Sequence, residues 1–120
     1  MTFNPKALDE YRSLLGDDFI PFFEELIDTY LQNTPNLLQS LQDALDGNDI
    51  ELFTRSAHSL KSNSRTFGAD GFADMAFVLE EIGNSGNLED ADENLAALID
   101  AYPQVVANLK GLQANIVNSG

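Results

Sequence analysis

The chain contains one histidine, His58, and three of its six basic residues lie close to it in the sequence. These three are Arg55, Lys61 and Arg65. At about 100° per residue on a helix, all three fall within about 60° of the histidine. Apolar and small residues of the same segment fall on the opposite arc: Ile50, Phe53, Ala57, Leu60, Ser64 and Phe67. The pattern predicts that His58 faces solvent and that the three cations share its face.

This face has the chemistry of an anion site. A neutral imidazole nitrogen is a nucleophile near pH 7, and lysine and arginine neutralise phosphate oxygens. Glu51 is the only acidic residue between Ile50 and Phe67, in a chain whose net charge is −14. The residue types therefore indicate a local positive patch suited to phosphate. A solvated surface histidine with ordinary basic neighbours is the alternative that these residues alone leave open.

The sequence from Ala57 to Ala69, AHSLKSNSRTFGA, is similar to the signature of the histidine-containing phosphotransfer (HPt) family of bacterial two-component phosphorelays. That signature is an alanine-histidine pair, a lysine three residues on, small residues and an apolar-glycine-alanine turn. The segment from Phe72 to Glu80 and the preceding helical segment over residues 18–46 also resemble the family. The resemblance covers most of the chain and implies a single HPt domain over residues 1–120, with its core at about 18–115.

The resemblance implies that His58 accepts a phosphoryl group from the aspartyl phosphate of one receiver domain and passes it to another. Lys61 would lie beside it and steady the phosphoryl oxygens. The receiver domains, in hybrid sensor kinases and response regulators, would supply Mg²⁺, and this chain would need no cofactor. No glycine-rich phosphate loop or kinase motif is present, so we expect no ATP-dependent kinase activity.

Four further residues complete the predicted site. Ser62 stands where the family usually has a glycine that lets the partner approach, and Glu80 stands where many relatives have a glutamine that hydrogen-bonds the imidazole. A carboxylate at position 80 would accept from the ring N–H and determine the tautomer. Arg65 is assigned beside His58 and Lys61 from its helical position alone, and Arg55 is expected to support docking.

Composition disfavours several other classes of function. One histidine and no cysteine exclude the common zinc sites, and the acidic residues around Gly47 depart from the spacing of a calcium-binding loop. The acidic surface makes nucleic acid and anionic membranes poor partners. Two alternatives stay open: a helical adaptor that binds receiver domains without turnover, and an enzyme that uses His58 as a general base.

The N-terminus shows neither the basic start nor the apolar run of a signal peptide, and no stretch is long and apolar enough to span a membrane. We therefore expect a cytoplasmic monomer. The starting Met1 and a length barely above that of the domain favour a free-standing protein.

The elements that must position these residues are predicted to be helices, because apolar residues recur with helical spacing and no segment alternates as a half-buried strand does. We expect helices over residues 4–15, 18–46, 48–67, 69–82 and 89–112, separated by glycines. They predict an all-α fold, an antiparallel up-down-up-down four-helix bundle with a short extra N-terminal helix.

Several details of these helices are specific expectations. Asn48 and Glu51 have the form of an N-terminal capping box, and Pro35 lies inside what we expect to be one kinked helix. The buried stripe of that helix is expected to contain Phe23, Ile27, Tyr30, Thr34, Leu37, Leu41 and Ala44. Phe19, Ile20 and Phe22 are candidates for a docking patch, or else they cap the core of the bundle.

Overall fold

The computed structural model describes the backbone of residues 13–119 and the side chains of residues 13–114. This part of the chain contains a short 3₁₀ turn followed by four α-helices and no strand. The elements are η1 (Gly16–Asp18), α2 (Phe19–Asp46), α3 (Ile50–Thr66), α4 (Asp70–Asn84) and α5 (Ala91–Ser119). The all-α fold is confirmed. The helix expected over residues 4–15 lies outside the described residues except for positions 13–15, which are helical.

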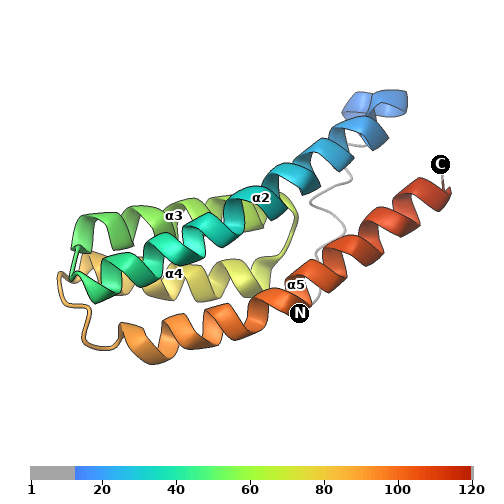
Figure 1. Cartoon of the computed structure of the whole chain (residues 1–120). Helices are drawn as coiled ribbons and strands as arrows, with labels where there is room; N and C mark the ends of the chain where they lie inside the picture. The colour runs from blue at the N-terminus through green and yellow to red at the C-terminus, as the bar shows by residue number, and fades with distance from the viewer. Residues whose placement is uncertain (1–12, 120) are drawn as a thin grey trace.

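The four helices pack as an antiparallel bundle in which α2 and α5 are the long members (Figure 1). They have 28 and 29 residues, against 17 for α3 and 15 for α4. The N-terminal end of α2 and the C-terminal end of α5 extend past α3 and α4 at the same end of the molecule (Figure 1). Prolines lie inside both long helices, Pro35 in α2 and Pro103 in α5, and neither divides its helix.

The core follows the predicted stripes with a few shifts. In α2, Leu38 is buried and Leu37 is only half-buried, so the prediction for Leu37 is wrong. The step from Thr34 to Leu38 ends about 40° beyond a full turn, and the step to Leu37 ends about 60° short of one, so both positions border the buried face. The packing of α2 against the neighbouring helices buries Leu38. Leu37 therefore packs on the flank of the core. Met75 in α4 is half-buried too and packs against the core.

The start of α3 differs from the predicted capping box. Asn48 adopts a positive φ of 53° and closes the turn after α2, a conformation that asparagine tolerates better than most residues. Asp49 is the N-cap, and its carboxylate accepts a hydrogen bond from the Leu52 N–H at 3.1 Å. The capping function therefore lies one residue later than expected.

A buried hydrogen bond joins α2 to α3. The Tyr30 hydroxyl lies 2.9 Å from Ser64 Oγ, and the Tyr30 ring packs edge-on against Phe67 with centroids 5.3 Å apart. Burial raises the pKa of the Tyr30 hydroxyl to about 12, so it stays protonated and able to donate at neutral pH. This contact holds the C-terminal half of α3 against α2.

The turn between α3 and α4 explains the apolar-glycine-alanine ending of the motif. Gly68 has a φ of 72°, which residues with a side chain rarely adopt. The Ala69 N–H then donates to the Ser64 carbonyl at 3.0 Å and closes the end of α3. Phe67 and Ala69 on either side are buried. The tight turn lays α4 antiparallel against α3, which brings a second helix to His58.

Candidate functional site

His58 lies on the solvent side of α3, with 62% of its side chain exposed. Its neighbours Ala57 and Leu60 are fully buried in the core of the bundle. The exposure predicted from the helical positions is therefore confirmed, and the ring is accessible to a partner.

Glu80 of α4 connects His58 to Lys61. Its Oε2 atom is hydrogen-bonded to His58 Nδ1, and its Oε1 atom accepts from Lys61 Nζ at 2.5 Å. Only 10% of the Glu80 side chain is exposed. One partly enclosed carboxylate thus holds both side chains that the sequence assigned to phosphoryl transfer.

The ionisation of Glu80 determines which imidazole nitrogen is free. Burial alone raises the pKa of this carboxyl, but the hydrogen bonds and charges of Lys61 and His58 outweigh it and hold the pKa below its usual value of 4.5. An ionised carboxylate only accepts hydrogen bonds, so His58 Nδ1 carries the hydrogen. In the neutral ring the lone pair is then on Nε2, the nitrogen that Glu80 does not occupy.

Lys61 is held on two sides beside His58. Besides the pairing with Glu80, its Nζ atom lies 5.0 Å from the centroid of the Phe77 ring, within the range of a cation–π contact. Only 15% of the Lys61 side chain is exposed. The ammonium group therefore lies at the site with little freedom to move.

The two arginines and Ser62 occupy more open positions. Arg65 lies 3.8 Å from Asp74 of α4, and both side chains are at least half exposed. Arg55 is exposed and forms no ion pair with any described residue, and Ser62 is exposed as well. Glu80 and Asp74 face two of the three cations, so the face carries both signs of charge.

The pairs between α3 and α4 follow one antiparallel register. Successive contacts are about one helical turn apart on each helix. The two residue numbers of each pair have nearly the same sum, as expected for antiparallel neighbours. From the N-terminal end of α3 the pairs are Thr54 with Gly83, His58 with Glu80, Lys61 with Phe77, and Arg65 with Asp74. Asp74 and Phe77 were missed by sequence reasoning, although the register of the predicted α3–α4 hairpin, counted from His58 and Glu80, would have found both.

The apolar residues proposed for a docking patch mainly cap the core. Phe19 is buried and stacks on Phe23 with ring centroids 5.5 Å apart, while Ile20 and Phe22 are half-buried. The large exposed apolar side chains nearest the site in sequence are instead on α4. These are Phe77 and Val78, at 40% and 45% exposure.

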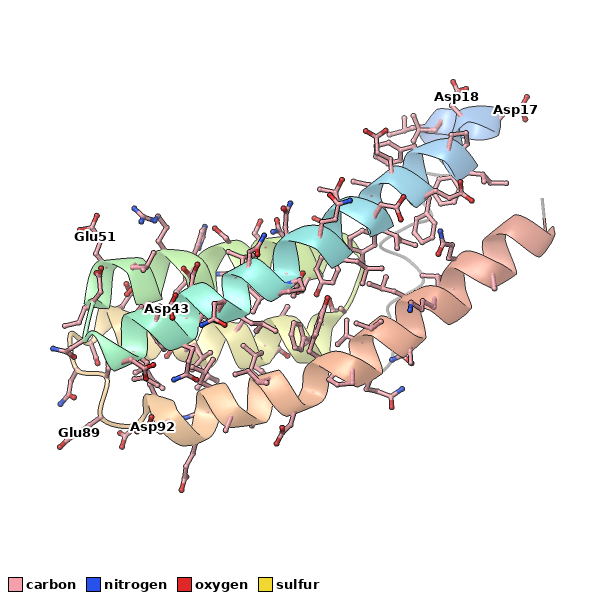
Figure 2. The ribbon with its side chains drawn as sticks, viewed as in Figure 1. Asp17, Asp18, Asp43, Glu51, Glu89 and Asp92 are labelled. Carbon is pink, nitrogen blue, oxygen red and sulfur yellow. The ribbon has the colours of Figure 1, made fainter. Side chains whose placement is uncertain are left out.

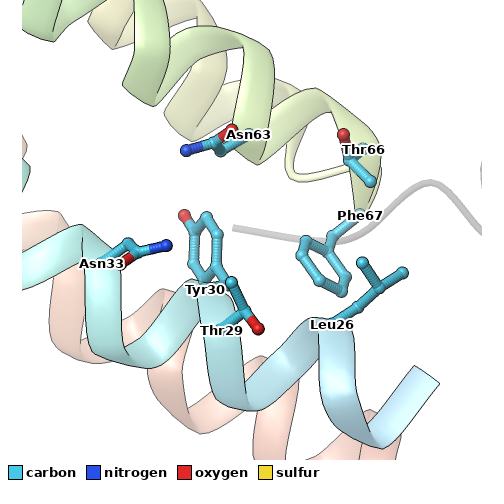
Figure 3. Close-up of a pocket in the computed structure, with 7 residues that line it drawn as sticks. All are labelled: Leu26, Thr29, Tyr30, Asn33, Asn63, Thr66 and Phe67. Carbon is cyan, nitrogen blue, oxygen red and sulfur yellow. The ribbon is translucent and has the colours of Figure 1, made fainter. Parts of the chain in front are cut away.

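A small pocket lies on the other flank of α3, where α3 meets α2 (Figure 3). It has a volume of about 130 Å³, and Figure 3 shows Tyr30 between the side chains of Asn33 and Asn63. It is separate from the His58–Glu80–Lys61 group. Among the described residues, no group of three or more histidine, aspartate or glutamate side chains is arranged to hold a metal ion.

None of the described helices combines the length and the hydrophobicity that a membrane-spanning helix requires.

The fold and the site together define an antiparallel helical bundle that presents one histidine, with a carboxylate and a lysine beside it, on the solvent side of α3. The sequence model of the Hpt domain family matches residues 25–108, and the chain belongs to this family.

Individual relatives agree over nearly the whole chain. The phosphorelay protein LuxU of Vibrio vulnificus, in strains YJ016 and CMCP6, is 26% identical over 112 residues, which are 93% of this chain and 95% of LuxU. The crystal structure of histidine-containing phosphotransfer protein B (HptB) from Pseudomonas aeruginosa PAO1 has the same fold, with a TM-score of 0.81. The match covers 94% of this chain and 95% of HptB at 24% identity.

Proposed function

We propose that this protein is a histidine phosphotransfer protein of a two-component phosphorelay. His58 accepts a phosphoryl group from the aspartyl phosphate of one receiver domain and donates it to another. The observation that carries the proposal is the exposed His58 whose Nδ1 is held by Glu80 beside Lys61. Membership of the Hpt family and the phosphorelay function named for LuxU support it.

The chemistry follows from the state of the ring. His58 Nε2 attacks the phosphorus of the aspartyl phosphate, an N–P bond forms, and the P–O bond to the aspartate breaks to release its carboxylate. The ring gains positive charge, which the Nδ1–H shares with the Glu80 carboxylate. Onward transfer reverses these steps on a second receiver aspartate.

The rest of the reaction is divided between this chain and its partner. Charge in such a transition state spreads over the phosphoryl oxygens, and Lys61 is the ammonium group placed beside His58 to meet it. Mg²⁺ would be held by the acidic pocket of the receiver, in a hybrid sensor kinase or a response regulator. The cytoplasmic location, the monomeric state and the single domain expected from the sequence stay predictions.

A panel of receiver domains from the same organism tests the proposal. Each receiver is phosphorylated on its aspartate by radiolabelled acetyl phosphate, freed of the remaining donor, and mixed with the wild-type protein or with His58→Gln. We expect the wild type to take label rapidly from at least one receiver and His58→Gln to take none. Uptake from no receiver, or equal uptake by His58→Gln, would contradict the proposal.

The same panel distinguishes the alternative of an adaptor that binds receivers without turnover. An adaptor would bind a receiver in titration calorimetry and leave the label on it. The paired His58, Glu80 and Lys61 favour transfer, because binding alone does not require an imidazole with a selected tautomer.

A further inference from the structure

The backbones of α3 and α4 come unusually close one turn away from the site. At Gly83, a Cβ atom would lie 2.1 Å from Thr54 Oγ1, 3.0 Å from Thr54 Cβ and 3.1 Å from Thr54 Cα. Real Cβ atoms essentially never approach other heavy atoms to less than 3.0 Å. The position is buried, so only a residue without a side chain allows this separation of the two helices.

Moving the Thr54 side chain would not fully relieve such a contact, because the Cβ and Cα atoms of Thr54 are also close. Its hydroxyl donates to the Ile50 carbonyl at 2.8 Å within α3. Rotation about χ1 would replace the oxygen by the methyl group in one of the few orientations that a helix allows. The Cα atom at 3.1 Å belongs to the backbone and moves only if the whole helix moves.

The contact adjoins the site on both helices. Gly83 follows Glu80 by three residues, and Thr54 precedes His58 by four, which is about one turn in each case. The hydrogen bonds of Glu80 to His58 and Lys61 are the next contacts along the same register. Relieving the 2.1 Å approach to the 3.0 Å that real Cβ atoms keep would move the two helices apart by about 1 Å at this point. A donor–acceptor pair at about 3.6 Å is no longer hydrogen-bonded, so the separation of the helices decides whether the carboxylate reaches both partners.

We propose that Gly83 is a positioning residue for phosphoryl transfer, because it lets α4 approach α3 closely enough for Glu80 to hold the His58 ring and Lys61 together. Its significance for transfer rests on the proposed function. Its effect on the imidazole does not, and is measurable without any partner.

The test is Gly83→Ala, read first by NMR of protein labelled with ¹⁵N-histidine. His58 is the only histidine, so the two ring-nitrogen signals belong to it. In the wild type at neutral or higher pH we expect a protonated Nδ1 and an unprotonated Nε2. In Gly83→Ala we expect the averaged signals of a ring that exchanges between tautomers, and phosphoryl uptake from a cognate receiver slower by about tenfold.

Rescue variants separate positioning from general damage. Thr54→Ala removes the oxygen that lies closest to the new methyl group and should restore part of the wild-type ring signals and uptake in the Gly83→Ala background. Thr54→Val retains two branches on Cβ and should restore neither. Gly111→Ala in α5 is the matched control, because a Cβ there meets no atom within 4 Å, and it should match the wild type.

Wild-type ring signals and wild-type uptake in a folded Gly83→Ala protein would overturn the inference, as would equal rescue by Thr54→Ala and Thr54→Val. If Gly83→Ala does not fold, Thr54→Val in the wild-type background provides a smaller expansion of the same contact. It should shift the His58 ring signals in the same direction, and unchanged signals would contradict the proposal. If the wild type accepts no phosphoryl group but the ring signals change as expected, the proposed function fails and the positioning inference stands.

Discussion

Glu80 is hydrogen-bonded to both the His58 ring and the Lys61 ammonium group, and the charge around both groups changes during the reaction. Before transfer, its carboxylate accepts from His58 Nδ1 and from Lys61 Nζ. Once the phosphoryl group is on Nε2, the ring carries more positive charge and its Nδ1–H is a stronger donor. Lys61 then lies between two acceptors, the carboxylate and the phosphoryl oxygens. A glutamine at this position would retain an acceptor for the ring N–H but would not neutralise the positive charge of Lys61.

Substitutions of Glu80 separate these two functions. Glu80→Gln retains an oxygen acceptor for the Nδ1–H and loses the charge, so we expect phosphoryl uptake within about threefold of the wild type. Glu80→Ala loses the acceptor and leaves Lys61 partly buried without its partner, so we expect a decrease of about tenfold or more. Initial rates of label uptake from a cognate receiver measure both. Equal rates for the wild type and a folded Glu80→Ala protein would show that the ring needs no positioning.

The lowered pKa of Glu80 predicts a dependence of stability on pH. The folded-state pKa lies below the unfolded value of about 4.5, so the stabilisation is complete above that pH and is lost as the pH falls through the folded-state pKa. The difference in free energy of unfolding between the wild type and Glu80→Gln should therefore decrease as the pH falls from about 4.5 to about 3. Urea titrations across this range measure it, and a difference that grows towards acid pH would contradict the assignment.

The residues of the site differ in how far the sequence could predict them. The position of His58 follows from helical periodicity, and Lys61 and Glu80 follow from the family resemblance. Asp74 and Phe77 lie on another helix, and their contacts depend on the register of α4 against α3. Helical positions on α3 therefore predicted the cations correctly, whereas the carboxylate that faces Arg65 depends on the packing of α4.

At the scale of the helices, the N-terminus of α3 depends on Asp49. Replacing an N-cap aspartate by alanine costs about 1 kcal/mol of stability, so Asp49→Ala should lower the free energy of unfolding by about that amount. The Leu52 amide, which donates to this carboxylate, should exchange its hydrogen faster. Asn48→Gly is the control, because glycine accepts the positive φ at this position, and it should be neutral or slightly stabilising. An Asp49→Ala protein with the wild-type free energy of unfolding would contradict the assignment of Asp49 as the N-cap.

Helix identity was predictable from the sequence, whereas helix ends and flanks were less so. All four described helices lie where the apolar stripes predicted them, because a period of 3.6 persists even across Pro35 and Pro103. The end of α5 lies seven residues beyond the predicted position 112, since no glycine or proline follows until Gly120. The choice between Leu37 and Leu38 depends on which neighbouring helix α2 contacts, and periodicity alone does not decide it.

At the scale of the molecule, the net charge of −14 contrasts with the mixed charge around His58. Acidic side chains lie at both ends of the bundle, with Asp17 and Asp18 at one end and Glu51, Glu89 and Asp92 at the other (Figure 2). The described basic residues are few, and three of the four are on α3. The α3–α4 face is therefore the part of the surface best suited to meet an acidic partner.

Self-repulsion of this charge predicts a dependence of stability on salt. Raising the ionic strength shortens the screening length from about 30 Å at 0.01 M to about 8 Å at 0.15 M, which weakens repulsion between carboxylates across the bundle. We expect the thermal midpoint to rise by several degrees, corresponding to about 1 kcal/mol. Calorimetry in NaCl at pH 7 measures the change, and a midpoint that falls as salt is added would show that attractive ion pairs dominate.

The bond formed in the phosphorylated protein tests the account most directly. The ¹⁵N-histidine-labelled chain is phosphorylated by a cognate receiver, and the coupling between phosphorus and each ring nitrogen of His58 is measured by NMR. Because Glu80 holds Nδ1, we predict a single phosphohistidine with phosphorus bonded to Nε2 and a proton retained on Nδ1. Phosphorus bonded to Nδ1, or a phosphoryl group on any residue other than His58, would contradict the account.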